Sequence, residues 1–472
     1  MPHATLPAPS QDELNASIRE AIDAVDAELR ELSLSIHSKP ELAWNEHHAH
    51  DVLTEYMARQ RGFVITKHAY DLPTAWTAVF TSSASTKERE KVPVVGFNSE
   101  MDALKGIGHA CGHNLIAIAG CAAAIGVART LERFQLPGKI VLLGTPAEEA
   151  GGGKAVLLKR GAYDEFDACL MVHPGTSGGG KHGAGMMTSS CVAGLTITYH
   201  GVSAHAGGAP EKGRNALDAA VLAYQNVSAL RQQLPKDAKV HGIITGCENW
   251  SANVIPGEAK LLYGIRSPAA SELARLIPRV LRCFAGAALA ANCTYTLASE
   301  ILYLDVRPSP GLAQAFKEFA EKEYGDEGYN IPEDLPTGGS TDFGNVSYHC
   351  PSLHPMFYLP DATGDEHPHS DSYTAAVATP SAHLATLRAS AALASSGLRV
   401  LISPSFRAQI RRDWEEDMRV AQGEKAFRAI ERLVPSVEIG PEGKEVREGR
   451  FCDCERRDGK TDLNSFPVAA RC

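Results

Sequence analysis

Side chains able to bind a metal ion or to transfer a proton follow directly after three short apolar segments that are predicted to be strands. They are Glu100, Asp102, His109, Cys111 and His113 after residues 92–99, Glu148 and Glu149 after residues 140–146, and His173 after residues 168–172. Because the carboxyl ends of the strands in an open α/β sheet form the ligand crevice, we expect these side chains to converge.

The residue types in this set suit a catalytic metal centre. Zinc accepts thiolate, imidazole and carboxylate ligands, and the set contains all three, in Cys111, His113, Glu149 and His173. A catalytic metal also needs an open position for water. Of the two adjacent acids, one can bind metal while its neighbour takes a proton from that water. The set therefore predicts metal-dependent hydrolysis.

Each member of the set also has an ordinary structural explanation when it is taken alone. A lone cysteine is usually a small buried side chain. His173 precedes a Pro-Gly turn, adjacent acids such as Glu148 and Glu149 are usually solvated, and the glycines at 151–153 could simply give flexibility. The repeated placement of these groups after strands favours the metal centre.

The elements that must position the set alternate between strands and helices. Residues 12–39 are predicted to form one N-terminal helix that ends near Pro40. Strands are expected near 91–99, 139–146 and 167–175, with helices near 114–134 and 153–162. This order predicts an α/β fold in which a mostly parallel sheet carries helices on both faces.

A change of pattern near Cys191, to four strands and two helices, indicates a compact inserted α+β domain. We expect a first part of the catalytic domain at 15–190, the inserted domain at 191–306, a second part of the catalytic domain at 307–400, and a charged helix with a tail at 401–472. The tail contains Cys452, Cys454 and Cys472, a poor zinc pattern that favours a mobile appendage.

The composition excludes several classes of partner. The chain has 472 residues, 44% hydrophobic and 22% charged, with a formal net charge of -10 that disfavours nucleic acid and anionic membranes. The N-terminal segment lacks an apolar leader, and we find no apolar run approaching the roughly 20 residues of a membrane span. We therefore expect a cytoplasmic protein. The odd number of cysteines, 11, disfavours a disulfide framework.

Seven segments between about residues 15 and 400 carry a specific family resemblance. They are EMDALKGIGHACGHN, GTPAEEAGGG, VHPG, GVSAHAGGAPEKGRNALDA, SANVIPGEAKLLYGIRS, STDFGNVS and HSDSY. The sequence resembles the amidohydrolase branch of the peptidase M20 metallohydrolases, which includes aminoacylases and hydrolases of indole-acetyl amino-acid conjugates. Within this branch it is most similar to dipeptidase-like members that act on β-alanyl-lysine.

The resemblance implies roles for the chemical groups. Two divalent metal ions, zinc or else manganese or cobalt, would share Cys111 as a bridging ligand, and the remaining ligands would be His113, Glu149, His173 and His369. Glu148 would be the general base, and Asp102 the carboxylate that orients a ligand. His367 is the alternative to His369, which the motif favours because Ser370 and Tyr373 follow it.

The resemblance also makes the inserted domain a lid that pairs two protomers. His205 would reach the partner's active site and hold the oxyanion, while Asn253 and Arg266 would bind the carboxylate end of the substrate. An ordinary surface arginine is the alternative for Arg266. Asn114 and Lys105 depart from the usual Asp and Pro of the branch.

These observations predict a hydrolase of amide bonds in small substrates, either dipeptides or N-acyl amino acids. The metals and Glu148 would activate a water molecule that attacks the amide carbonyl. The alternative from another class is a non-catalytic binding or scaffold protein that keeps the fold. That alternative would be marked by loss of a ligand or of the base, and neither is seen in the sequence.

Overall fold

The computed structural model divides the chain into two compact units. The main unit comprises residues 1–189, 303–420 and 439–444, and the inserted unit comprises 190–302, 421–438 and 445–472. The residues that the structure describes are 9–87, 92–176, 183–184, 186–246, 250–324, 335–336, 338–360, 367–421, 425, 428–430, 438–439, 445–446 and 450–451. The tail cysteines Cys452, Cys454 and Cys472 lie outside these ranges, so the prediction of a mobile appendage lies outside the described residues.

The main unit is built around a mixed sheet. In spatial order its described strands are β1 (Phe63–Lys67), β2 (Trp76–Thr81), β4 (Lys139–Thr145), β3 (Val94–Glu100), β5 (Ala168–Leu170) and β16 (Ser352–Leu353). The pairs from β4 to β16 are parallel, whereas β1, β2 and β4 pair antiparallel. The expected α/β fold with a mostly parallel sheet is confirmed, and the antiparallel edge is the part that sequence patterns missed.

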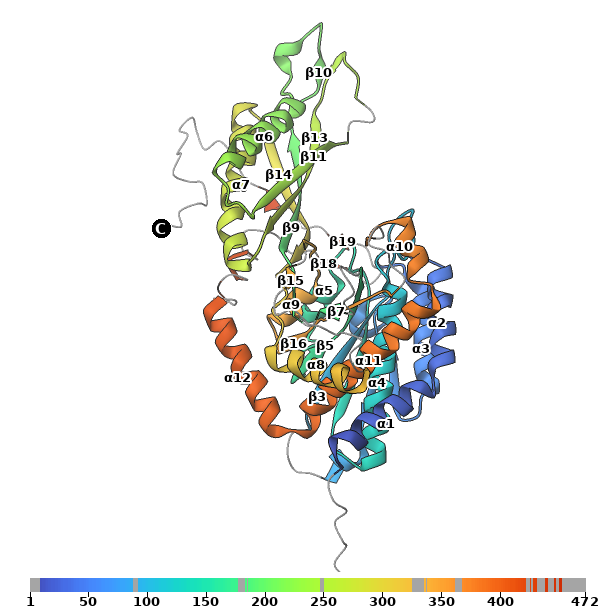
Figure 1. Ribbon diagram of the computed structural model, residues 1–472. Helices are drawn as coiled ribbons and strands as arrows, with labels where there is room; N and C mark the ends of the chain where they lie inside the picture. The colour runs from blue at the N-terminus through green and yellow to red at the C-terminus, as the bar shows by residue number, and fades with distance from the viewer. Residues whose placement is uncertain are drawn as a thin grey trace, which may run out of the picture. The chain divides into compact units, whose positions relative to one another are not determined.

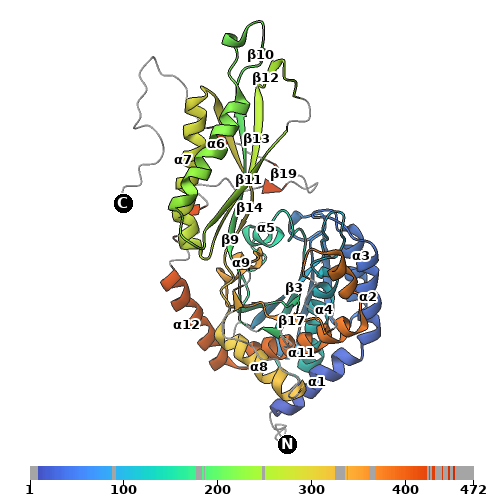
Figure 2. The ribbon, with the colours of Figure 1, turned by 45° about the horizontal axis from the view of Figure 1, so that its top comes forward.

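The longest described helix of the first half, α4 (His113–Phe134), is the centre of the core. The helices α1 (Gln11–Asp23), α2 (Asp26–Ser38) and α11 (Pro380–Ile402) pack against it, and its own face packs on β3 (Figures 1 and 2). The prediction of one N-terminal helix was wrong. The chain leaves helical geometry at Val25 (φ -118°), so that α1 packs on α4 and α11 while α2 packs on α4 and α3 (His47–Arg59).

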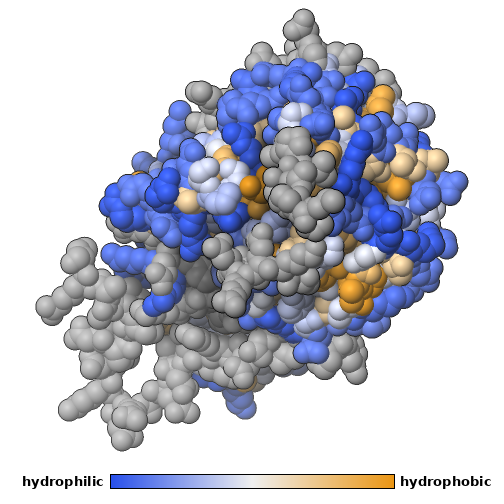
Figure 3. All heavy atoms as spheres, turned by 90° about the horizontal axis from the view of Figure 1, so that it is seen from below, coloured by the Kyte–Doolittle hydropathy of each residue, from blue (hydrophilic) through white to orange (hydrophobic). Residues whose placement is uncertain are grey.

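Helix α4 corrects the prediction that no apolar run approaches the length of a membrane span. Its 22 residues are long and apolar enough to cross a membrane by length and composition, which the sequence patterns alone did not indicate. However, 94% of its most apolar window is buried inside the protein, as expected for a core helix. On the face seen in Figure 3, the apolar side chains form separate patches among hydrophilic ones.

The main unit contains further described helices and short strands. They are α5 (Gly153–Lys159), α8 (Pro310–Tyr324), α9 (Phe343–Ser347), α10 (Asp371–Ala376), α12 (Pro404–Ala421), β6 (His173–Gly175), β7 (Gly183–Ala184), β8 (Met187–Thr188), β15 (Leu335–Pro336) and β17 (Met356–Tyr358). Of these, α5, α8 and α9 contact the sheet. The short strands β18 (Glu438–Ile439), at the boundary of the two units, and β19 (Glu445–Val446), in the inserted unit, pair with each other. The charged helix expected after residue 400 is α12, and its Trp414 Nε1 donates to the Ser347 carbonyl oxygen at 2.8 Å.

The inserted unit is a second, antiparallel sheet with two helices. Its described strands have the order β11 (Lys239–Thr245), β13 (Glu258–Ser267), β9 (Cys191–His200), β14 (Thr294–Tyr303) and β20 (Arg450–Phe451). The helices α6 (Ala216–Leu230) and α7 (Ala270–Ala290) pack on one another and on β9 and β13. The two-residue strands β10 (Ala204–His205) and β12 (Val254–Ile255) pair with each other at one end of this unit (Figure 2).

Candidate metal centre

The metal-binding side chains predicted after separate strands do converge. Two groups of ligand atoms, each lying within 4.8 Å of one another, are Cys111, His113 and His173, and Cys111, Glu149 and His369. Cys111 belongs to both. A third group joins His113, Glu148 and Glu149. The arrangement therefore supplies two neighbouring cation positions with one thiol between them.

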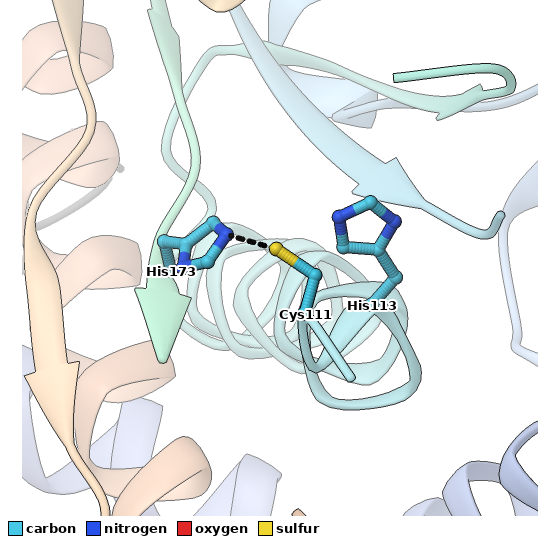
Figure 4. Close-up of side chains that lie close together, drawn as sticks. All are labelled: Cys111, His113 and His173. Carbon is cyan, nitrogen blue, oxygen red and sulfur yellow. Dashed lines mark hydrogen bonds between the residues drawn. The ribbon is translucent and has the colours of Figure 1, made fainter. Parts of the chain in front are cut away.

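In each of the two groups, one pair of ligand atoms lies at a distance that matches metal coordination. Cys111 Sγ lies 3.4 Å from His173 Nε2 (Figure 4), and His369 Nε2 lies 3.5 Å from Glu149 Oε2. A tetrahedral zinc ion places sulfur and nitrogen ligands roughly 3.6 Å apart, and nitrogen and oxygen ligands about 3.4 Å apart. These pairs can therefore each span one zinc ion without rearrangement.

Local backbone geometry brings Cys111 and His113 to this point. Gly112 has a φ of +81° and is the N-cap of α4, so His113 occupies the first position of that helix. A Cβ atom on Gly112 would lie 2.5 Å from Cγ of Pro174, beside His173. Only glycine therefore lets the Cys-Gly-His turn approach the strand that carries His173.

Asp102 orients both a ligand and the loop that carries the acids. Its Oδ1 lies 3.1 Å from Nδ1 of His113, and its Oδ2 accepts a hydrogen bond from the Glu149 N–H at 2.9 Å. With Nδ1 held, the Nε2 atom of His113 is the one available to a metal. Asp102 therefore contacts both His113 and the loop of Glu149, and the bond to the Glu149 backbone was not anticipated.

Two residues that sequence reasoning missed hold the same loop. Ala147 is in a left-handed conformation (φ +59°), and its N–H donates to Glu46 Oε1 at 2.8 Å. Glu46 is fully buried and also accepts from Trp44 N and Thr74 Oγ1. Tyr303 donates its hydroxyl to the Glu148 carbonyl oxygen at 2.6 Å. No local pattern reveals the contacts to Ala147 and Glu148, because Glu46 and Tyr303 are more than 100 residues away from them.

The electrostatics of the cluster are those of crowded buried acceptors. Burial raises the pKa of Cys111, and burial together with Glu100 and Glu149 raises that of Glu148. Burial lowers the pKa of His173 to about 4. For His113, burial acts to lower the pKa, but the Glu100 and Asp102 carboxylates outweigh it and raise the value. A bound cation would relieve this crowding.

Unpartnered atoms show that the donor set fits a metal. His113 Nε2 and Glu149 Oε1 are buried and have no hydrogen-bond partner among the described residues. A buried polar atom without a partner is costly and rare, and metal coordination satisfies it. The thiol, imidazole and carboxylate donors are those of zinc sites. The residues present therefore fit two divalent ions.

Other predicted residues do not join the ligand groups. His109 is buried and stacks on His37 with ring centroids 6.2 Å apart. His367 is exposed, and its Nδ1 lies 3.2 Å from the Pro368 carbonyl oxygen, whereas His369 belongs to a ligand group. Asn114, which stands where Asp is usual, donates to Ser33 Oγ and to the Val377 carbonyl oxygen. A carboxylate at this position could not donate those two hydrogen bonds, so the Asn in place of the usual Asp is explained by contacts in the core.

The three residues predicted in the inserted unit form two separate sites within it. His205 is exposed, its Nδ1 accepts from the N–H groups of Gly207 and Gly208, and its Nε2 lies 3.4 Å from Asn253 Nδ2. Arg266 is half-buried near the far end of β13, opposite Lys239. The structure thus brings Asn253 to His205 and does not bring Arg266 to either.

Comparison with known proteins finds a family model and curated relatives that match this chain. The model of Peptidase family M20/M25/M40 matches residues 92–391. The chain is 40% identical over 427 residues to the Xaa-Arg dipeptidase of Homo sapiens, covering 87% of this chain and 94% of the relative. It is 31% identical over 301 residues to a p-aminobenzoyl-glutamate hydrolase chain of Escherichia coli strain K12, covering 60% of each.

Two solved structures share the fold. An aminobenzoyl-glutamate utilization protein from Klebsiella pneumoniae aligns with a TM-score of 0.63 at 20% identity, over 82% of this chain and 98% of the other. A dinuclear metal-binding peptidase of the M20 family from Bacillus subtilis aligns with a TM-score of 0.56 at 20% identity, over 80% and 99%. At this level of identity the likeness concerns the fold alone.

Proposed function

The chain belongs to peptidase family M20/M25/M40 and is a hydrolase of carbon–nitrogen bonds, and from this premise we propose that its substrates are dipeptides with a basic C-terminal residue. The support is the similarity to an Xaa-Arg dipeptidase over 94% of that relative's length. The resemblance to β-alanyl-lysine dipeptidases in the motif residues points to the same substrates.

The observation that carries the reaction is the sharing of Cys111 between two ligand groups beside Glu148. Cys111, His113 and His173 would hold one divalent ion, and Cys111, Glu149 and His369 the other. When bound, such ions lower the pKa of the attacking water and polarise the amide carbonyl. The carboxylate of Glu148, 3.9 Å from His113 Nε2, stands at the edge of this pair.

Glu148 moves the protons of the reaction. Its carboxylate takes a proton from the attacking water as the new carbon–oxygen bond forms, and it gives that proton to the leaving amine as the carbon–nitrogen bond breaks. Burial and nearby carboxylates raise its pKa, which suits a group that must be protonated and deprotonated in one cycle. Glu46 accepts a hydrogen bond from the Ala147 N–H, and Tyr303 donates one to the Glu148 carbonyl oxygen. These two bonds fix the backbone that carries the Glu148 carboxylate.

Zinc is the proposed metal. A shared thiolate with imidazole and carboxylate ligands favours a borderline metal over magnesium or calcium, which prefer oxygen ligands. Manganese and cobalt accept the same donors and are the alternatives.

We further propose that the active enzyme is a homodimer joined through the inserted unit. In the described part of this unit β11 is an edge strand, and Val221, Leu222 and Tyr224 on α6 are exposed. His205 and Asn253 would then serve the partner's active site, and Arg266 would bind the substrate carboxylate. We expect the enzyme in the cytoplasm.

The second candidate function is release of an acyl group from an N-acyl amino acid. It is supported by the similarity to a p-aminobenzoyl-glutamate hydrolase chain and to an indole-3-acetyl-aspartic acid hydrolase of Enterobacter agglomerans. The metal chemistry of the two candidates is the same, so substrate contacts decide between them. A non-catalytic scaffold would lack part of the donor set or the base, whereas this chain contains both.

A substrate screen with zinc-loaded protein tests the proposal. The panel contains β-alanyl and α-dipeptides ending in Arg, Lys or Leu, together with N-acetyl-arginine and p-aminobenzoyl-glutamate. We expect the highest kcat/KM on dipeptides ending in Arg or Lys. Faster turnover of the acylated amino acids would favour the second candidate. Turnover of none of them, with about two zinc ions bound per chain, would instead favour the non-catalytic binding protein.

A further inference from the structure

A buried lysine lies beside the metal centre and outside its ligand groups. Lys154 is completely buried in the first turn of α5. Its ammonium Nζ lies 2.5 Å from Glu100 Oε1 and 2.6 Å from Asp342 Oδ1. Its backbone N–H also donates to Asp342 Oδ2, at 2.7 Å. A lysine is almost never fully buried unless paired, and here one side chain serves two carboxylates.

The glycine run before Lys154 places it there. A Cβ atom on Gly153 would lie 1.7 Å from the Pro146 carbonyl oxygen, and Gly152 has a φ of +65°. Any side chain at Gly153 would therefore collide with the backbone just before Glu148. The glycines at 151–153 are therefore needed for the close packing of α5 against the 146–149 loop, and flexibility is not required to explain them.

The carboxylates held by Lys154 face the reacting groups. The second oxygen of Glu100, Oε2, lies 3.3 Å from His113 Nε2 and has no hydrogen-bond partner among the described residues. Oxygens of Glu100, Glu148 and Asp342 all lie within 4.8 Å of one another, and all three residues are buried. Without a fixed positive charge these three groups would repel one another and move apart.

We propose that Lys154 is a positioning residue: its ammonium is a built-in cation that clamps Glu100 and Asp342 together and so holds His113 and Glu148 in their working positions. This inference rests on the proposed function for its catalytic readout. The positive charge of Lys154 is an addition to the site, because neither the metal ligands nor the general base supplies a positive charge. Because this ammonium group is part of the Lys154 side chain, it is present at every metal concentration.

The test compares Lys154→Met with a double variant that restores the charge balance of the cluster. In Lys154→Met, Glu100 and Asp342 lose their counterion, and the double variant Lys154→Met/Asp342→Asn removes one charge of each sign. Lys159→Met, an exposed lysine on the same helix, is the matched control. Each protein is assayed for zinc affinity by competition with a chelator, for thermal unfolding, and for kcat and KM at saturating zinc on the best substrate of the screen.

We expect Lys154→Met to bind zinc about 10- to 100-fold more weakly, as is usual when a residue that orients a ligand is lost. At saturating zinc its kcat should fall about 100-fold while KM changes less than about threefold, because a small misplacement of the base affects the transition state. The double variant should recover at least about tenfold of that kcat, since Glu100 then faces one neighbouring carboxylate, Glu148, instead of two. Lys159→Met should match the parent protein.

Three results would overturn the inference. One is wild-type zinc affinity and kcat in Lys154→Met. Another is a lower unfolding temperature with normal zinc affinity and kcat, which would mark a purely structural lysine. The third is a double variant no more active than Lys154→Met. If Lys154→Met does not fold, Glu100→Gln tests the same clamp and should lower both zinc affinity and kcat. Failure of the parent protein on every substrate would refute the proposed function, whereas the zinc affinities would still decide the role of Lys154.

Discussion

The metal centre in the main unit and the His205–Asn253 pair in the inserted unit are built in opposite ways. At the metal centre, His113 is completely buried, and Asp102 holds both this ligand and the loop of Glu149. His205 and Asn253 are exposed, and the described hydrogen bonds of their side chains are to each other and to the glycines that follow His205. Apart from His369, whose side chain is 54% exposed, the first site is enclosed by its own unit, and the second presents polar groups outward.

This difference in burial indicates which step of the reaction each site can support. A preorganised buried site suits metal binding and proton transfer, where geometry must be kept within a fraction of an ångström. An exposed imidazole and amide suit a contact that is completed only when another surface arrives. In the proposed dimer that surface is the partner's active site, so changes at the two sites should differ in kind as well as in size.

The largest effect is expected from Cys111→Ala. Because Cys111 belongs to both ligand groups, its loss should weaken both metal positions and reduce bound zinc below one per chain. The rate should fall roughly 10⁴-fold, since a metal contributes several kcal/mol to the transition state. Metal analysis and kcat/KM measure this. The control is Cys121→Ala, at a buried thiol that belongs to no ligand group among the described residues. Normal zinc content in Cys111→Ala would contradict the shared-thiolate assignment.

Replacement of the base should separate chemistry from metal binding. Glu148→Gln should lower kcat roughly 10³-fold with zinc content unchanged, because a general base contributes about 10²- to 10⁴-fold. Glu149→Gln should lose zinc as well as activity, since Glu149 belongs to the ligand group with His369. Turnover at the normal rate by zinc-loaded Glu148→Gln would show that another group is the base.

His205→Ala sharpens the comparison because it should leave the metal centre intact. We expect about a 10²-fold loss of kcat with full zinc content, as for loss of one oxyanion donor. Mixing and refolding this variant with Glu148→Gln should restore roughly a quarter of the parent activity, because a heterodimer regains one complete site. Absence of any recovery, with heterodimers detected by mass spectrometry, would refute the composite site.

The smallest of the four effects is expected at Glu46. Glu46→Gln keeps the shape of the side chain but replaces one of the two oxygens that accept hydrogen bonds from Ala147, Trp44 and Thr74 with an NH2 group. We expect up to about a tenfold loss of kcat with KM and zinc content unchanged, since one hydrogen bond contributes about 0.5–1.5 kcal/mol. Glu41→Gln is a comparison on the same segment, where the carboxylate accepts from the backbone of α3. An equal loss in both variants would show that Glu46 acts only through stability.

The convergence of Cys111, His113, Glu149 and His173 could be predicted from the sequence because its signals are local, whereas His369 came only from the family resemblance. Cys111 and His113 lie in one motif, Glu148 and Glu149 in another, and each motif follows a strand whose apolar pattern is visible without a structure. Parallel strands place their carboxyl ends at one edge, so convergence followed from topology alone. The break between α1 and α2 and the antiparallel strands β1 and β2 were missed, because packing on α4 and on β4 decides them.

The sequence by itself therefore determined the α/β fold and a donor set for metals, and the division of the two adjacent acids between metal binding and proton transfer stays a prediction. Only the tertiary structure decided what holds that chemistry in place. Glu46, Tyr303 and Asp342 reach the site from segments far away in the chain, and Lys154 acts only because Glu100 and Asp342 meet around it. Side-chain charge and donor type are properties of single residues, whereas a hydrogen bond or a buried ion pair exists only between groups that folding has brought together.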